Sequence, residues 1–146
     1  MKKVIHLTAL LAAFLFLHPR PAAGAGSSAG RPPNIICIML DEWGYFESSM
    51  MGHPILKTPN IDRMAAEGMR FTQFLAGGNV CAPTRCVLMT GQHSGHATVR
   101  GNNGSAPIRR EDVTIAQMLK TGGYTCGGFG KWGIGESGTS GAPTLH

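Results

Sequence analysis

A continuous apolar run at residues 35–40, rich in isoleucine, ends abruptly at two acidic residues, Asp41 and Glu42. A run this short, with no polar alternation, is typical of a β-strand that is buried on both faces. Such a strand needs other elements on either side of it. It therefore constrains the possible folds of this chain more than any other segment.

A helix and a second strand are predicted after this run. Thr58 and Pro59 are typical of an N-cap and a first helical residue, and Gly68 is typical of a helix end. The sequence thus predicts an amphipathic helix over residues 59–67, and residues 69–75 (MRFTQFL) have the composition of a strand. The apolar stripe expected on this helix consists of Ile61, Met64 and Ala65.

A further helix is predicted near the end of the chain. Thr114 and Gln117 fit a capping box, and Gly122 fits a helix stop. Residues 124–132 then have the pattern of a glycine-rich strand that ends near Lys131. The stripe expected to be buried on this helix consists of Ile115, Met118 and Leu119.

Strands that alternate with helices predict a layered α/β fold, in which ligands bind at the carboxyl ends of the strands. Asp41, Glu42 and Lys131 would all lie at such ends. The alternative is that the two acids form a turn and the lysine is an ordinary surface residue.

The N-terminus has the pattern of an export signal. Lys2 and Lys3 precede an apolar run at residues 4–17, and small residues at 23–25 fit a cleavage site. We therefore expect a signal peptide at residues 1–25, a linker at 26–33 and a domain at 34–146. The protein would be exported, whether periplasmic, secreted or lysosomal.

Charge and hydropathy exclude two classes of partner. The formal net charge of +5 falls to +2 once Lys2, Lys3 and Arg20 are removed with the signal. A nucleic-acid-binding protein needs a clustered basic face, which this chain lacks. No later segment has about 20 uninterrupted apolar residues, so membrane insertion after signal removal is not expected.

The stretch NVCAPTRCVLMTG predicts a helix with chemistry at its entrance. Pro83 fits the first helical residue, and the pair Thr90 and Gly91 fits the end. Cys81 would then lie where backbone N–H groups and the helix dipole favour an anion. The Arg85 side chain leans toward the same end of the helix and adds a positively charged guanidinium there.

Several roles are open for Cys81. Four cysteines in an exported chain permit two disulfides, although Cys37 is most simply a core residue of its apolar run. A thiolate nucleophile would be activated by the helix entrance but opposed by nearby acids. A zinc site would use the spacing C-x4-C-x6-H-x2-H, which differs from that of zinc fingers. Its ligands would be Cys81, Cys86, His93 and His96.

The segment from Cys81 to Arg85, followed by LMTG, resembles the sulfatase signature built on C-x-P-x-R. The segment GKW around Lys131, with Gly123 and Tyr124 before it, resembles the second signature of that family. The resemblance implies a three-layer α/β/α, alkaline-phosphatase-like fold. Residues 34–146 would be the N-terminal part of a truncated sulfatase catalytic domain, a fragment that alone would be expected to bind metal weakly and to turn over poorly or not at all.

The resemblance also implies an active site. A formylglycine-generating enzyme would oxidise Cys81 to formylglycine, whose diol attacks the sulfur of a sulfate ester and later releases sulfate. Arg85 would stabilise the diol, Lys131 would bind a sulfate oxygen, and Ca²⁺ would be held by Asp41, Glu42 and position 81. The substrate would be a sulfated carbohydrate or an aryl sulfate.

The sequence departs from the family pattern at several positions. Glu42 replaces a common aspartate, and Gly133 replaces a histidine that many sulfatases have after Lys-Trp. Asn79 and Cys126 replace small or hydroxyl residues at the edges of the signatures. Two alternatives remain: a phosphatase relative of the same superfamily, and a small exported zinc- or disulfide-stabilised module.

Overall fold

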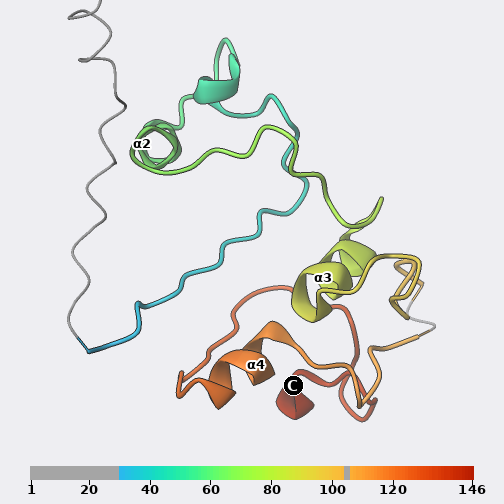
Figure 1. Ribbon diagram of the computed structural model, residues 1–146. Coiled ribbons are helices and arrows are strands. Elements are labelled where there is room, and N and C mark those ends of the chain that lie inside the picture. The colour runs from blue at the N-terminus through green and yellow to red at the C-terminus, as the bar shows by residue number, and fades with distance from the viewer. Residues whose placement is uncertain (1–29, 104–105) are drawn as a thin grey trace, which may run out of the picture. The chain divides into compact units, whose positions relative to one another are not determined.

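The computed structural model describes residues 30–103 and 106–146, so the predicted signal peptide and half of the linker lie outside the described residues. The chain divides into two units, Met1–Ile38 and Met39–His146. Within the described residues, no helix is long and apolar enough to cross a bilayer. The helical elements are η1 (Ser49–Met51), α2 (Pro59–Glu67), α3 (Cys81–Thr90), α4 (Ile115–Thr121) and η2 (Pro143–Leu145), of which the three α-helices are labelled in Figure 1.

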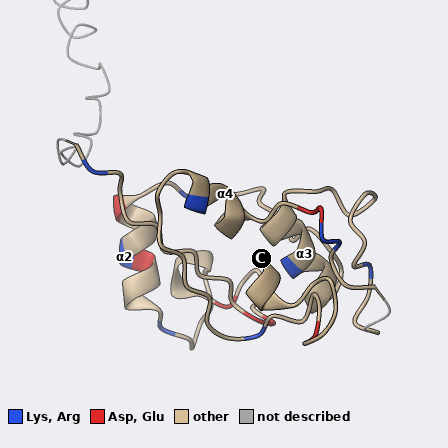
Figure 2. Cartoon of the chain, turned by 90° about the horizontal axis from the view of Figure 1, so that it is seen from below, with Lys and Arg blue, Asp and Glu red and all other residues tan. Residues whose placement is uncertain are grey.

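Helix α2 has the predicted bounds, with Thr58 before it and Gly68 after it. The Thr58 side chain does not cap the helix backbone, however. It donates to Asp62 Oδ1 at 2.9 Å, and Ser49 Oγ donates to Asp62 Oδ2 at 2.5 Å. These bonds lower the pKa of Asp62, the bond from Ser49 being the largest cause. They join η1 to α2, which carries charges of both signs (Figure 2).

Helix α4 begins as its capping box predicts. Thr114 Oγ1 accepts from the Gln117 N–H at 3.3 Å, and Gln117 Oε1 accepts from the Thr114 N–H at 2.8 Å. Gly122 follows the helix. Because a cap involves residues three apart, the sequence alone specifies it.

The three predicted strands are wrong for this structure. Residues 35–40, 69–75 and 124–132 are irregular and mostly exposed. A strand exists only where its backbone pairs with a neighbouring strand. Outside the helices, the backbone hydrogen bonds of the described residues form mostly turns and helix caps. The layered α/β sheet is therefore not formed by the residues that the structure describes.

The predicted burial of several apolar residues is wrong for the same reason. Met64 is 66% exposed and Met118 is 55% exposed, while Leu119 is only half-buried. Cys37, expected in the core, is also exposed. Met64, Met118 and Leu119 were expected on the apolar stripes of their helices and Cys37 in a buried strand. Among the described residues there are no paired strands to form a sheet that would cover them.

A small core lies around α3 instead. Trp132 packs against it and donates from Nε1 to the carbonyl of Gly141 at 2.8 Å. The Ile108 N–H donates to the Ile134 carbonyl at 2.9 Å. This core fixes the segment that carries Lys131 relative to α3. Its buried members are Ala82, Cys86, Ala97, Val99, Ile108 and Ile134.

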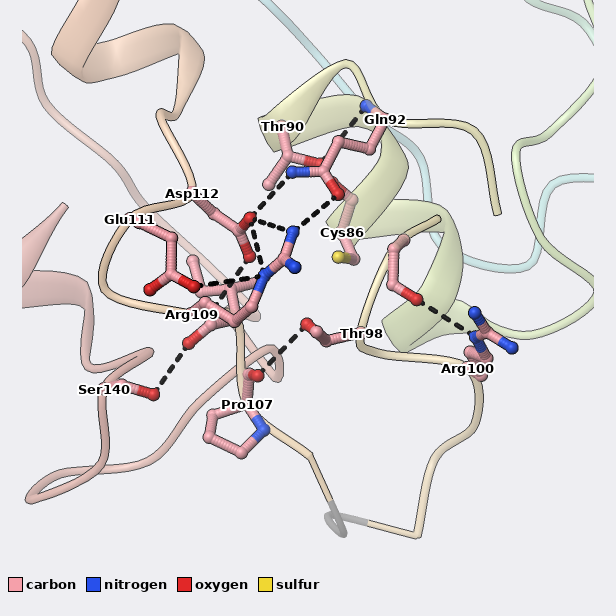
Figure 3. A network of polar contacts seen from close by, with 12 residues as sticks. Cys86, Thr90, Gln92, Thr98, Arg100, Pro107, Arg109, Glu111, Asp112 and Ser140 are labelled. Carbon is pink, nitrogen blue, oxygen red and sulfur yellow. Dashed lines mark hydrogen bonds and ion pairs between the residues drawn. The ribbon is translucent and has the colours of Figure 1, made fainter. Parts of the chain in front are cut away.

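A polar network joins the loop after α3 to the segment before α4 (Figure 3). The buried carboxylate of Asp112 accepts from Arg109 Nη2 and from Gln92 Nε2, both at 2.7 Å. The Arg109 N–H also donates to this carboxylate at 2.8 Å. Ser140 Oγ donates to the Ile108 carbonyl at 2.8 Å, and this bond joins the loop near the C-terminus to the network. Together with the core, these bonds position α3.

Candidate functional site

Helix α3 begins two residues earlier than predicted. Its first residue is Cys81, so Pro83 is the third helical residue rather than the first. Proline is tolerated there because the N–H groups of the first turn have no partner within the helix. Gly91 ends the helix with φ of 66°, as its sequence position predicts. Cys81 therefore lies in the first turn, at the positive end of the helix dipole.

Two glycines let the preceding chain run directly against α3. A Cβ on Gly77 would lie 2.3 Å from Val87 Cγ1, and a Cβ on Gly78 would lie 2.7 Å from Pro83 Cβ. These approaches are closer than real Cβ atoms show. The two glycines thus allow the loop to turn into the helix and place Cys81 at its entrance.

Cys81 lies beside two nitrogen donors. Its Sγ is 3.9 Å from Lys131 Nζ and 3.5 Å from Asn102 Nδ2. Lys131 Nζ also donates to Asp41 Oδ2 at 3.2 Å. The structure therefore brings together Asp41, Cys81 and Lys131, three predicted site residues that are far apart in the sequence.

The charge on Lys131 is stabilised by these neighbours. Its hydrogen bond to Asp41 raises the pKa of the Lys131 ammonium above its ordinary value, and attraction to Asp41 and to Cys81 adds to the increase. Lys131 is exposed. It is thus a positive charge that solvent and a bound anion can both reach.

Arg85 is half-buried on the same helix. Its Nε is buried without a hydrogen-bond partner among the described residues. Its Nη2 lies against Gly133, where a Cβ would approach to 2.6 Å. A buried donor without a partner costs free energy, on the order of 1–3 kcal/mol. An acceptor can reach this nitrogen only when the side chains that cover it move.

A cavity of about 410 Å³ opens beside the entrance of α3. Asp41, Glu42, Cys81 and Arg85, four of the five predicted site residues, are among the residues that line it. Glu42 has φ of 52°, in the left-handed region that residues other than glycine rarely adopt. Four predicted residues thus share one cavity, and Lys131 is joined to it by its hydrogen bond to Asp41.

The donors at this cavity suit a hard cation only in part. Asp41 and Glu42 offer carboxylate oxygens, the ligand type that Ca²⁺ prefers, but Ca²⁺ takes about 6–8 oxygens. Within the described residues, no group of three or more histidine, cysteine or acidic residues is arranged to hold a metal. The type of donor fits calcium, whereas these two residues provide only some of the oxygens that its coordination shell needs.

The spacing that suggested zinc does not form a site in the structure. Cys86 is buried in the core, whereas His93 and His96 are exposed. Their rings lie edge to face, with 6.4 Å between the ring centroids. All four cysteines, each of which lies in the described residues, are free, so the disulfide-stabilised alternative is wrong for this structure.

Asn102 is a site residue that the sequence analysis missed. Its carboxamide contacts both Cys81 Sγ and the backbone N–H of Ala82, at 3.5 and 2.9 Å. The only sequence signal was its place in the polar stretch RGNNG, which is typical of any loop. No spacing rule links this loop to the helix 20 residues before it.

Comparisons with known proteins give one consistent result. The family model described as Sulfatase matches residues 33–143. Arylsulfatase A of Homo sapiens is 40% identical over 121 residues, which cover 78% of this chain and 23% of that protein. N-acetylgalactosamine-6-sulfatase of Sus scrofa is 37% identical over 127 residues, which cover 79% of this chain and 24% of that protein. Steryl-sulfatase of Homo sapiens is 36% identical over 124 residues, which cover 77% of this chain and 21% of that protein. The chain thus spans less than a quarter of the length of these relatives.

Proposed function

Because this chain belongs to the sulfatase family, we propose that its cavity is part of an active site that hydrolyses sulfate esters. Cys81, Arg85 and Lys131 are the catalytic residues of this proposal, and the substrate is a sulfated carbohydrate or an aryl sulfate. The observation that carries it is the position of Cys81, in the first turn of α3 and 3.9 Å from Lys131 Nζ.

The site attracts a tetrahedral anion through three kinds of positive group. The entrance of α3 presents backbone N–H groups and the positive end of its dipole. Lys131 Nζ is exposed and beside Cys81. Arg85 contributes a guanidinium whose Nε has no hydrogen-bond partner in the part of the chain that the structure describes. A sulfate group next to position 81 would accept hydrogen bonds from these donors, which would stabilise charge that develops on its oxygens.

Position 81 is proposed to act through oxygen. Once a formylglycine-generating enzyme has oxidised Cys81, one oxygen of the hydrated aldehyde would attack the sulfur of the ester and the bond from sulfur to the alcohol oxygen would break, releasing the alcohol. The second hydroxyl would then collapse to the aldehyde and expel sulfate. Cys81 is half-buried and lines the cavity, so this position faces the space in which a substrate would bind. Arg85 would orient the group at position 81, and Lys131 would hold a sulfate oxygen.

Calcium is the cation proposed for this site. Asp41 and Glu42, with an oxygen at position 81, would hold it at the cavity, and the ion would neutralise negative charge there. The oxygen donors support this assignment. The remaining ligands would come from substrate, water or residues beyond those named here.

Export is the second part of the proposal, and it depends on residues 1–25. Oxidation of Cys81 by a formylglycine-generating enzyme and passage through an export pathway would both precede activity. N-terminal sequencing of the protein recovered outside the cytoplasm tests this part. A mature N-terminus near Gly26 is expected, and a retained Met1 would contradict it.

The central test is co-expression of the chain with a formylglycine-generating enzyme. Mass spectrometry of the tryptic peptide 71–85 should show conversion of Cys81. The purified protein, which carries only the N-terminal part of the domain, should hydrolyse p-nitrophenyl sulfate slowly when Ca²⁺ is supplied. Cys81→Ala is the matched control and should be inactive. An unmodified thiol at position 81 would overturn the proposal, and preferential hydrolysis of p-nitrophenyl phosphate would favour the phosphatase alternative.

A further inference from the structure

Asn102 bridges the first two residues of α3. Its Oδ1 accepts from the Ala82 N–H at 2.9 Å, and its Nδ2 donates to Cys81 Sγ at 3.5 Å. Asn102 lies in the loop that follows Arg100, far along the chain from the helix it contacts. One exposed carboxamide therefore reaches both the backbone of the helix entrance and the reacting atom of the proposed site.

The helix needs the first of these contacts. The N–H groups of the first turn have no partner within an α-helix and are usually capped by a preceding side chain. Val80, the N-cap residue of α3, makes no side-chain cap. Asn102 supplies the missing acceptor to Ala82 from another part of the chain.

The same contact fixes the direction of the amide. Only the oxygen of a carboxamide can accept from the Ala82 N–H, so the NH₂ group of Asn102 must lie on the other side. That side carries Cys81 Sγ. The cap therefore ensures that Asn102 presents a donor, rather than an acceptor, to position 81.

We propose that Asn102 is a further active-site residue, which holds the reacting atom of position 81 by donating a hydrogen bond to it. This assignment rests on the proposed function. When an oxygen replaces the sulfur, Nδ2 would donate to that oxygen and restrict the side chain to one orientation toward the cavity. A neutral amide does this without adding a negative charge that would repel a sulfate ester.

Two substitutions separate this role from helix capping. Asn102→Asp keeps an oxygen for the Ala82 N–H but replaces the donor to Cys81 with a second, negatively charged oxygen. Asn102→Ala removes both contacts. Asn103→Asp introduces the same charge one residue away and serves as the control for long-range electrostatics.

The test uses the full chain with its encoded thiol. Alkylation of Cys81 by iodoacetamide is followed on peptide 71–85, with the exposed Cys37 of the same molecule as the internal reference. We expect Asn102→Asp to slow alkylation of Cys81 about threefold or more, because the donor to its sulfur is replaced by a negatively charged oxygen and the side chain is no longer held toward the cavity. Asn103→Asp should leave the rate near that of the unsubstituted chain.

The melting temperature provides the second measurement. Asn102→Asp should melt close to the unsubstituted chain because the cap is kept, whereas Asn102→Ala should melt lower. Equal alkylation rates in Asn102→Asp and the unsubstituted chain would overturn the proposal and leave Asn102 as a cap alone. An equal decrease in Asn103→Asp would also overturn it, since charge alone would then explain the effect.

A failure of the Asn102 proposal can be distinguished from a failure of the proposed sulfatase function. The alkylation contrast concerns the unmodified thiol and requires neither formylglycine nor a substrate. If Cys81 is never converted to formylglycine, the sulfatase proposal fails while the contact of Asn102 is still measured. If Cys81 is converted, Asn102→Asp should lower kcat for p-nitrophenyl sulfate more than it changes KM.

Discussion

The Arg85 guanidinium and the Gly133 backbone occupy adjoining space, so that a Cβ at residue 133 would lie 2.6 Å from Arg85 Nη2. Gly133 also has φ of 62°, a conformation that favours glycine. Many sulfatases resemble this chain around Lys131 but have a histidine at the position of Gly133. In this chain a side chain there and the observed position of Arg85 exclude each other.

The first prediction concerns Gly133→Ala. The added methyl group should displace the Arg85 guanidinium and lower the turnover of p-nitrophenyl sulfate by the converted protein on the order of tenfold or more, because small displacements of a catalytic group are costly. Binding of inorganic sulfate, measured by calorimetry, should weaken in parallel.

Gly91→Ala is the matched control for this substitution. Gly91 has nearly the same φ, 66°, but a Cβ there would have no atom within 4 Å. Both substitutions impose the same type of backbone strain, and only one of them contacts Arg85. Equal losses of sulfate binding in the two variants would show that strain, and not Arg85, is responsible.

The second prediction concerns the positive charge beside Cys81. Lys131→Gln removes the charge that Asp41 holds 3.2 Å away and should reduce sulfate ester turnover on the order of 10²-fold, as the loss of a group that stabilises developing charge does. Lys120→Gln, which changes an exposed lysine in the last turn of α4, should leave turnover unchanged. Steady-state kinetics of both variants provide the measurement, and a similar turnover in both would contradict the proposed role.

The helices could be predicted from the sequence because their signals are local. Pro59 and Gly68 delimit α2, and Thr114 and Gln117 begin α4, through contacts that span at most four residues. The strands could not be predicted reliably in this way. A strand requires a partner elsewhere in the chain, and the apolar run at residues 35–40 contains no information about whether one is present.

The candidate site was predictable to the extent that its residues carry their own chemical signal. Asp41 and Lys131 were placed at one site from their positions at predicted strand ends and from the family resemblance, and the structure brings them within 3.2 Å. The strands that motivated part of that argument are not formed. Asn102 was missed because its contact with Cys81 depends on the path of an irregular loop, for which no spacing rule exists.

The third prediction concerns the cap of α4. Thr114→Ala removes the acceptor for the Gln117 N–H and should lower the free energy of unfolding by about 1 kcal/mol, the typical contribution of an N-cap side chain. Thr121→Ala, at the exposed end of the same helix, should cost less because, within residues 30–103 and 106–146, its hydroxyl bonds only to the Met118 carbonyl. Urea denaturation of both variants, followed by circular dichroism, measures the difference. A larger loss for Thr121→Ala would contradict the assignment of the capping box.

The last prediction concerns the pH dependence of stability at Asp112. Burial alone would raise the pKa of this carboxyl, but hydrogen bonds from the side chain and backbone of Arg109 and from Gln92 lower it below the ordinary value of 3.8. A depressed pKa means that the folded state binds the proton less tightly than the unfolded state does. The ionised carboxylate therefore stabilises the fold above about pH 3.8, and this contribution is lost as the pH falls through the folded-state pKa.

Asp112→Asn should consequently lower the free energy of unfolding at pH 7 by about 2 kcal/mol, because it leaves donors of Arg109 and Gln92 without a charged acceptor. Glu111→Gln is the control, since Glu111 is exposed and its ion pair with Arg109 is long, at 3.8 Å. The difference in urea midpoint between Asp112→Asn and the unsubstituted chain should decrease as the pH is lowered below about 3.8, since the unsubstituted chain then loses the same contribution. A difference that does not vary with pH would mean that Asp112 acts through its shape and not through its charge.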